Sequence, residues 1–434
     1  MNKLKIGSLR TNLILICLIF QLFNRIGTLE EGINVFSFSS LWDSKNDTSS
    51  ESSSESQYSE FCQIIKDFGY PCEIHSVMTK DGYKLTLFRI PDSHYYKLRK
   101  SVSDVPKKQP ILLQHGLLGS SITWVINNKD QSLAYILADH GYDVWLMNSR
   151  GNCYSCEHDT LNSESKEYWD FTFEDMAKYD LPAAVDYIIN VTGFPTVSYV
   201  GYSQGTMIFF ISNLLYPDLA DKVPIAFLLG PVANVSGIQN GFLRVLSGYG
   251  AGNMLQFLGF QRFSPSPTLF RWLIVDFCTQ CETCCLSIIE SIVGPHHASF
   301  NRSRMPFISS HEPGGTSTKN MIHYTQLINQ KQFQSYDYGE VDNVNHYNST
   351  KPIVFNLSKL SPKLKLYIYS GSKDTLSNPV DVASLVGQLP KESVKKWKII
   401  KDFAHIDFVW SIAAHNVIYD DILYNLDDHL NFSQ

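Results

Sequence analysis

Positive charge is scarce in this chain of 434 residues. Lysine and arginine number 36 against 42 aspartates and glutamates, which gives a net charge of −6. A nucleic-acid-binding protein normally presents a basic face, and no lysine or arginine cluster stands out here, so we exclude that class. Apolar residues make up 44% of the chain and charged residues only 18%. This composition can bury a sizeable core and excludes a wholly disordered chain.

The start of the sequence lacks an apolar run long enough to cross a membrane. Lys3, Lys5 and Arg10 precede the run Leu13–Phe23, whereas a membrane-spanning helix needs about 20 apolar residues. A basic start followed by roughly 7–15 apolar residues is typical of a secretory signal peptide. We therefore predict a signal peptide over residues 1–28 and a secreted or lysosomal protein. An uncleaved amphipathic anchor is the alternative, because no Ala-x-Ala cleavage site follows.

Cysteine is also sparse, and nine residues are too few for a miniprotein built from disulfides. Removal of Cys17 with the signal peptide leaves an even number, which favours disulfides in an oxidising compartment. Seven Asn-x-Ser/Thr sequons support secretion only weakly, because some occur by chance in a chain rich in Asn and Ser. These candidate N-glycosylation sites are Asn46, Asn190, Asn234, Asn301, Asn348, Asn356 and Asn431.

Two groups of cysteines are candidates for disulfides. Cys62 and Cys72 lie ten positions apart near the expected start of the fold, and Cys278 and Cys285 delimit a second group. The spacing within this second group also resembles a zinc site. Four thiolates within eight residues cannot readily point at one metal, and no distant pair completes a site, so we predict no metal. Free thiols remain the other alternative.

The distribution of polar and apolar residues divides the rest of the chain into a linker and a folded region. Residues 29–59, above all the Ser- and Glu-rich stretch 44–59, have almost nothing to bury and are predicted to be a linker. Folded structure is expected from about Phe61. The length admits either one large α/β domain with an insertion or two ordinary domains.

Short apolar runs then alternate with helical stretches, which predicts a mostly parallel sheet with helices on both faces. The alternation stops after Leu229 and resumes at Leu364. We therefore predict an α/β core in two parts, 60–231 and 358–434, around a cap insertion, 232–357. The expected strands are 84–90, 111–114, 143–147, 196–200, 225–229, 364–369 and 396–400, and the expected helices are 132–140, 172–190 (bent or interrupted near Pro182) and 206–215.

The most specific local pattern is Gly201-Tyr202-Ser203-Gln204-Gly205. It lies between an expected strand and an expected helix, the context that a nucleophile elbow requires. Such an elbow is a tight turn that lifts a serine Oγ above the sheet edge. A Cβ at either glycine would collide with a neighbouring strand or helix. Ser203 is therefore predicted to be a catalytic nucleophile.

A nucleophilic serine needs a base to accept its proton and an acid to orient that base. In this architecture both follow later in the chain, at the carboxyl ends of later strands. Asp374 follows the expected strand 364–369, and His405 lies five residues beyond the strand that ends at Ile400. The other twelve histidines precede the serine or fall in the insertion or the terminal helical stretch. We therefore predict Asp374, in preference to Asp381, and His405.

Acyl transfer also needs donors for the negative charge on the tetrahedral oxygen, commonly two backbone N–H groups. Gln204 is the first predicted donor, because it begins a helix whose dipole favours an anion. Leu117 is the second, because it follows His115-Gly116 at the end of the expected strand 111–114, where a His-Gly pair lets the main chain turn sharply. An ordinary strand-to-loop turn is the alternative interpretation of that pair.

Several segments resemble the acid lipase family, which includes gastric and lysosomal acid lipases. Residues 112–121, Leu-Leu-Gln-His-Gly-Leu-Leu-Gly-Ser-Ser, resemble its oxyanion segment, and His405-Ile406-Asp407-Phe408 resembles its histidine loop. Residues 313–326 resemble its return from cap to core. Further matches occur at 69–71, 79–83, 89–91, 143–152 and 176–183, so that the resemblance covers about residues 60–430.

This resemblance implies an α/β-hydrolase core under a mainly helical cap, no cofactor, and lipid esters as substrates. The expected function is hydrolysis of triacylglycerols or sterol esters, at a lipid–water interface or micelle surface, through a Ser-His-Asp acyl-enzyme mechanism. We expect the cap to determine substrate length, with aromatic residues that line an acyl passage or form the cap's own core: Phe257, Phe263, Phe270 and Trp272. The alternatives are a carboxylesterase for short esters and a catalytically silent lipid-binding protein on the same fold.

Three features depart from the family pattern. Tyr202 replaces the usual histidine beside the nucleophile, and we expect its side chain to pack against neighbouring strands without affecting catalysis. Cys153 and Cys156 stand where the family has no regular cysteine pair, and we expect them to add a local bridge. The cluster Cys278–Cys285 is denser than the family pattern.

Overall fold

The computed structural model describes residues 50–93, 108–233, 235, 237, 261–263, 278, 281–295 and 300–431. The predicted signal peptide, 1–28, lies outside the described residues, as does the centre of the predicted insertion with Phe257, Phe270 and Trp272. Within the described ranges, no helix is both long enough and apolar enough to cross a membrane. The described residues from Ser53 onward form one compact unit.

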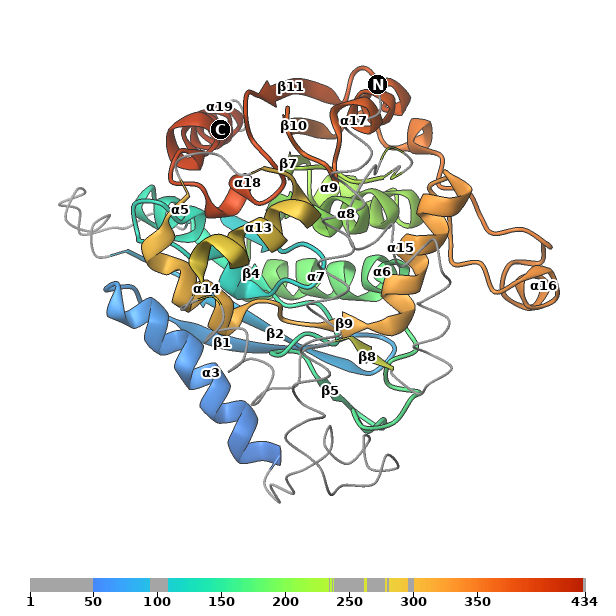
Figure 1. Ribbon diagram of the computed structural model, residues 1–434, viewed down its shortest axis with the longest axis horizontal. Coiled ribbons are helices and arrows are strands. Elements are labelled where there is room, and N and C mark those ends of the chain that lie inside the picture. Colours follow the sequence, from blue (N-terminus) through green and yellow to red (C-terminus); the bar gives the residue numbers. More distant parts are fainter. Residues whose placement is uncertain are drawn as a thin grey trace. The chain divides into compact units, whose positions relative to one another are not determined.

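A nine-stranded mixed sheet forms the centre of this unit (Figure 1), in the order β1-β2-β4-β3-β6-β7-β10-β11 with β5 paired to β2. The strands from β4 to β11 in this order pair in parallel, and β2 pairs antiparallel with β1, β4 and β5. The strands are β1 (Glu73–Met78), β2 (Tyr83–Ile90), β3 (Pro110–Gln114), β4 (Asp143–Met147), β5 (Glu157–His158), β6 (Ser198–Tyr202), β7 (Ile225–Leu229), β10 (Lys365–Gly371) and β11 (Val394–Ile400).

Burial on both faces explains why the central strands could be predicted. Every residue of β3, β4, β6 and β7 is buried, as in parallel strands covered by helices on both sides. The predicted mostly parallel sheet is confirmed, although β6 ends at Tyr202 and not at Val200. The edge strand β1 was not predicted, because its polar and apolar residues are mixed without a continuous apolar run, and only Val77 in it is buried.

Helices cover both faces of the sheet. Apolar residues of α7 and α8 pack with one set of strand side chains, which includes Leu112. Residues of α3, α5 and α19 pack with the opposite set, which includes Ile111 and Leu113. The helices of the described core are α3 (Ser50–Asp67), α5 (Leu133–Asp139), α6 (Phe173–Asp175), α7 (Leu181–Thr192), α8 (Gln204–Leu215), α9 (Leu219–Lys222), α17 (Pro379–Gln388), α18 (Asp407–Trp410) and α19 (Asp420–Asn431).

Of two sequence predictions about helices, one needs correction and the other is confirmed. Helix α3 begins at Ser50, so residues 50–59 of the predicted linker are helical. Phe61 and Ile65 are fully buried and hold the helix against the sheet, whereas Glu55, Ser56 and Gln57 are exposed. The expected helix 172–190 is interrupted near Pro182, as predicted: a π-helical turn, Met176–Asp180, comes just before Pro182, which lies in the first turn of α7.

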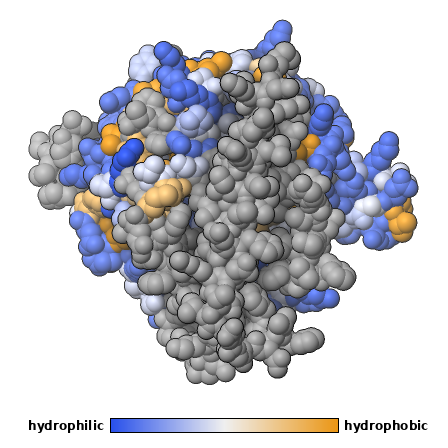
Figure 2. Space-filling view, in the orientation of Figure 1, coloured by the Kyte–Doolittle hydropathy of each residue, from blue (hydrophilic) through white to orange (hydrophobic). Residues whose placement is uncertain are grey.

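The described parts of the predicted insertion, 232–357, are largely helical. They contain α13 (Glu282–Val293), α14 (Met305–His311), α15 (Thr318–Gln330), α16 (Glu340–Tyr347) and the strand pair β8 (Arg262–Phe263) and β9 (Thr316–Ser317). Helix α15 packs in the same apolar cluster as α7 and α8, so this part of the segment belongs to the packing of the core. Helix α16 projects from its surroundings (Figure 1), and Figure 2 shows apolar surface at this end of the molecule. Val341 of α16 is 80% exposed.

The predicted disulfide candidates are confirmed. Cys62 is bonded to Cys72, and Cys278 to Cys285. The other two cysteines of that cluster, Cys281 and Cys284, are bonded to each other, so the cluster leaves no thiolate to ligate zinc.

The expected bridge between Cys153 and Cys156 is wrong. Neither residue is in a disulfide. The chain turns here, and the Cys156 thiol donates instead to the carbonyl oxygen of Asn152 at 2.9 Å.

The described sequons differ in accessibility. Asn190, Asn348 and Asn356 are exposed. Asn301 is only 8% exposed, and its Nδ2 donates to Gln131 Oε1 at 2.9 Å, so a glycan there would require this bond to break. Asn431 is the last residue of α19, while Asn46 and Asn234 lie outside the described residues.

Candidate active site

Ser203 lies in a strained turn between β6 and α8. Its backbone adopts φ 54° and ψ −117°, a conformation that non-glycine residues rarely adopt. Its N–H donates to the Leu229 carbonyl of the adjacent strand β7 at 2.9 Å. A Cβ on Gly205 would lie 2.7 Å from the Gln114 carbonyl oxygen, and one on Gly201 would lie 3.0 Å from the Gly205 carbonyl carbon. The turn therefore requires both glycines, as an elbow does.

A chain of hydrogen bonds connects three predicted site residues. His405 Nε2 lies 2.8 Å from Ser203 Oγ, and His405 Nδ1 lies 2.8 Å from Asp374 Oδ2. Ionised Asp374 can only accept, so Nδ1 carries the proton and Nε2 accepts from the serine hydroxyl. Exposed fractions are 8% for Ser203 and 3% for both Asp374 and His405. This geometry can transfer the serine proton to the imidazole.

The sheet topology brings these residues together. Ser203 follows β6, Asp374 follows β10 and His405 follows β11, and parallel strands present their carboxyl ends at one edge. The other oxygen of Asp374, Oδ1, accepts from the N–H groups of Leu376 (2.9 Å) and Ser377 (2.7 Å), which fixes the carboxylate. Asp381 instead accepts from Gly237 N–H at 2.8 Å, consistent with the preference for Asp374.

The segment that follows β3 lies against the serine. A Cβ on Gly116 would lie 2.9 Å from Ser203 Cβ, so Leu117 begins a loop beside the nucleophile. His115 braces this loop, because its Nδ1 donates to the Gly116 carbonyl at 2.8 Å and its Nε2 accepts from Ser149 N–H at 3.1 Å. Gln204 opens helix α8, so its N–H has no acceptor within the helix. Both predicted donors thus belong to segments that adjoin Ser203.

The Gln204 side chain is held by a contact that the sequence did not reveal. Asn320, fully buried in α15, donates through Nδ2 to Gln204 Oε1 at 2.9 Å. Its own Oδ1 accepts from the N–H of Phe173 at 2.8 Å. In the sequence, the one indication of this contact was that Asn320 interrupts an apolar helical face with a polar side chain. The contact connects the returning segment of the insertion to the elbow.

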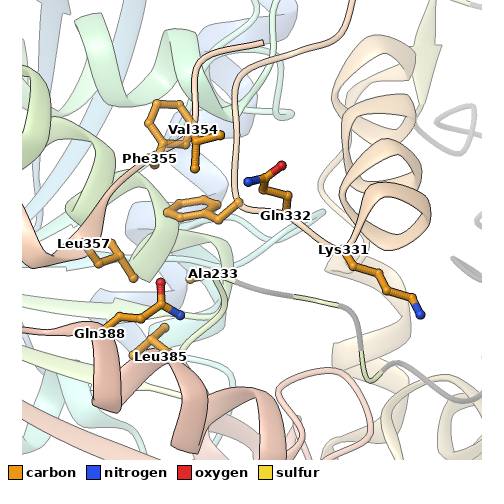
Figure 3. A pocket seen from close by; sticks show the side chains of 9 residues that line it. Ala233, Lys331, Gln332, Val354, Phe355, Leu357, Leu385 and Gln388 are labelled. Atoms are coloured by element: carbon orange, nitrogen blue, oxygen red, sulfur yellow. The ribbon is translucent and has the colours of Figure 1, made fainter. Parts of the chain in front are cut away.

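A separate cavity of about 230 Å³ lies among α17, the segment after β7 and the loops that flank α16 (Figure 3). Its lining combines apolar and polar side chains, and in Figure 3 Lys331 extends away from the apolar ones. No residue of the hydrogen-bonded chain lines it. The lining residues are Ala233, Lys331, Gln332, Phe333, Val354, Phe355, Leu357, Leu385 and Gln388. In the described part of the chain, no three His, Cys, Asp or Glu side chains group as a metal site.

Two buried histidines make stability depend on pH. Burial lowers the pKa of His115 to about 4 and that of His323 to about 3, whereas an unfolded histidine titrates near about 6.5. Between the folded and unfolded pKa values, the unfolded chain therefore binds more protons than the folded chain. The contribution of the two neutral histidines to stability is complete above about pH 6.5 and is lost as the pH falls. Acidification from pH 7 to 4.5 should cost on the order of 2–3 kcal/mol per histidine.

Urea unfolding at pH 7 and pH 4.5 tests this expectation. His323→Gln should lose less stability on acidification than the wild type, because glutamine does not titrate and keeps a donor for the Gln334 carbonyl that His323 Nε2 now bonds at 2.9 Å. His346→Gln, at an exposed position of α16, is the matched control. If both variants and the wild type lost equal stability between pH 7 and pH 4.5, His323 would not be a source of the pH dependence.

Comparisons with known proteins agree with this geometry. Residues 61–128 match the partial α/β-hydrolase lipase region, and residues 109–267 match the α/β-hydrolase fold family. The chain is 37% identical to human lysosomal acid lipase/cholesteryl ester hydrolase and 35% identical to bovine (Bos taurus) gastric triacylglycerol lipase, with 83% of this chain and 89% of each relative covered. It is 36% identical to human lipase member K, over 85% of this chain and 90% of that one.

Proposed function

The chain belongs to the acid lipase family on the α/β-hydrolase fold, and from that premise we propose that it hydrolyses the carboxylic esters of lipids. The observation that carries the proposal is the buried hydrogen-bonded chain from Ser203 through His405 to Asp374. Two relatives are named for triacylglycerol and cholesteryl ester hydrolysis, so triacylglycerols, sterol esters or both are the proposed substrates. Catalysis would occur at a lipid–water interface or micelle surface.

The mechanism has two acyl-transfer steps. His405 Nε2 accepts the Ser203 proton as Oγ attacks the ester carbonyl carbon, and the resulting oxyanion is held by the N–H groups of Leu117 and Gln204. His405 then gives that proton to the departing alcohol, which leaves an acyl-serine. A water molecule, deprotonated by His405, releases the fatty acid and restores Ser203. Asp374 stabilises the imidazolium in both steps.

A panel of three substrates distinguishes this function from its alternatives. We expect hydrolysis of triolein, of a cholesteryl ester or of both, as well as of p-nitrophenyl butyrate, assayed at pH 4.5 and pH 7.5. Activity on the butyrate ester alone would instead identify a carboxylesterase for short esters. Specific binding of triolein with no hydrolysis of any substrate would identify a silent lipid-binding protein.

Substrate length would be selected by the insertion. Each CH₂ removed from water contributes roughly 0.8 kcal/mol, and a bare sheet edge offers little such burial. The insertion, 232–357, whose centre lies outside the described residues, is therefore proposed to cover the acyl chain. The three disulfides and the exposed sequons at Asn190, Asn348 and Asn356 further support a proposed secreted or lysosomal location.

Gly116→Ala is expected to lower kcat by about 10- to 100-fold. The added Cβ would lie 2.9 Å from Ser203 Cβ and 3.1 Å from Tyr202 Cδ1, so the loop that carries the Leu117 N–H must shift. A misplacement of about 1 Å at a catalytic group can cost about 100-fold. Gly387→Ala is the control, because no atom lies within 4 Å of its added Cβ. Wild-type kcat for p-nitrophenyl butyrate in Gly116→Ala would exclude Leu117 as a donor.

A further inference from the structure

Tyr202 occupies the junction of three loops at the site. It is the last residue of β6 and precedes Ser203, and it is 8% exposed. A Cβ on Gly116 would lie 3.1 Å from its Cδ1, so its ring adjoins the loop after β3. Its ring centroid lies 5.2 Å from that of the His405 imidazole. Tyr202 packs in the same buried cluster as strand residues such as Leu229, as expected, and it contacts these loops in addition.

The Tyr202 hydroxyl contacts the histidine loop directly. It donates to the backbone carbonyl oxygen of His405 at 3.0 Å, in a buried environment. In a regular helical turn the N–H of Val409 would bond this carbonyl, but it bonds the Ile406 carbonyl instead, at 3.1 Å. The Tyr202 hydroxyl thus supplies a donor for the His405 carbonyl, which Val409 of the short helix α18 does not bond. Burial raises the pKa of Tyr202 well above its ordinary value, so the hydroxyl keeps its proton.

We propose that Tyr202 is a positioning residue, whose hydroxyl fixes the main chain of His405 relative to Ser203. The proposal rests on the proposed function of Ser203 and His405. Asp374 fixes the imidazole from one side through Nδ1, and the Tyr202 hydroxyl fixes the backbone from which the imidazole extends. Without this second anchor, the distance from Nε2 to Oγ is no longer held at 2.8 Å. Proton transfer depends steeply on such alignment, whereas substrate binding does not.

Tyr202→Phe tests the proposal, because it removes the hydroxyl and keeps the ring. Tyr419→Phe is a matched control: its buried hydroxyl donates at 2.7 Å to the backbone carbonyl of Phe408, three residues beyond His405. Both variants lose one hydrogen bond from a buried tyrosine to the same loop. Each would be assayed with p-nitrophenyl butyrate, with kcat normalised by active-site titration so that only folded, reactive protein counts.

We expect Tyr202→Phe to lower kcat about 10-fold with KM within about twofold of wild type. Tyr419→Phe should keep both constants within about twofold, while the urea midpoints of the two variants fall by similar amounts. Equal kcat in the two variants would reduce the Tyr202 hydroxyl to a structural role and overturn the proposal. Ser203→Ala is assayed in the same series, because retained hydrolysis in that variant would refute the proposed function instead.

Discussion

Ser203→Ala should abolish nearly all hydrolysis of lipid esters, with kcat lower by roughly 10⁴- to 10⁶-fold. The hydroxyl forms the acyl-enzyme, and alanine leaves His405 Nε2 without the oxygen that now lies 2.8 Å away. Residual activity would come from the oxyanion donors and from substrate binding. His405→Ala should cost about as much, and Asp374→Ala somewhat less, because the imidazole survives without its orienting carboxylate.

Ser198→Ala is the control for this substitution. Ser198 begins the same strand, β6, is 2% exposed, and lies at the end of the strand opposite Ser203. Its activity should remain within about twofold of wild type. Because the three residues act as a unit, Ser203→Ala combined with His405→Ala should be no less active than either alone. Multiplicative losses in the double variant would contradict a shared role.

Asp180→Ala should have the largest effect on stability. Arg150 is 1% exposed, and its guanidinium contacts both Asp180 Oδ1 and Asp81 Oδ2 at 2.6 Å. Burial by itself would lower the pKa of Arg150, but the charges and hydrogen bonds of the two carboxylates raise it above its ordinary value. Removal of Asp180 leaves a buried cation with only one partner. We expect the free energy of unfolding to fall by about 3–5 kcal/mol.

Urea unfolding of Asp180→Ala and Asp186→Ala separates this burial effect from ion pairing in general. Asp186 lies on α7, the helix that begins directly after Asp180. It pairs with Lys222 at 2.7 Å, but both side chains are substantially exposed. An exposed pair contributes about 0–1 kcal/mol, so Asp186→Ala should be nearly neutral. Similar small losses in both variants would show that the buried network does not stabilise the core.

The fold could be predicted where burial imposed a simple pattern. The continuous apolar runs of β4 and β7 gave the observed strand bounds, because strands covered on both faces admit few polar residues. Helix α3 was missed in part, because its serine-rich start carries no apolar pattern, and its fully buried residues, Phe61 and Ile65, lie in its second half. Strand β1 was missed because only one of its residues, Val77, is buried, so that its sequence contains no continuous apolar run.

The three residues of the hydrogen-bonded chain could be predicted because each follows a strand in the chain order of this architecture. The contacts around them could not. Tyr202 bonds a backbone carbonyl more than 200 residues away in sequence, and Asn320 reaches Gln204 across 116 positions. Such contacts depend on how loops are placed in space, which local pattern does not encode. The spacing of Cys153 and Cys156 likewise resembled a bridge, but the local turn directs the Cys156 thiol to a carbonyl.

Covalent labelling tests the central claim, that Ser203 is the nucleophile, most directly. The protein would be treated with a long-chain alkyl p-nitrophenyl phosphonate, which reacts with an activated serine, and then digested for peptide mapping by mass spectrometry. We expect one label per chain, on Ser203 alone, with loss of activity in proportion to labelling and no labelling of Ser203→Ala. Inactivation with the label on another residue, or full activity with Ser203 completely labelled, would contradict the account.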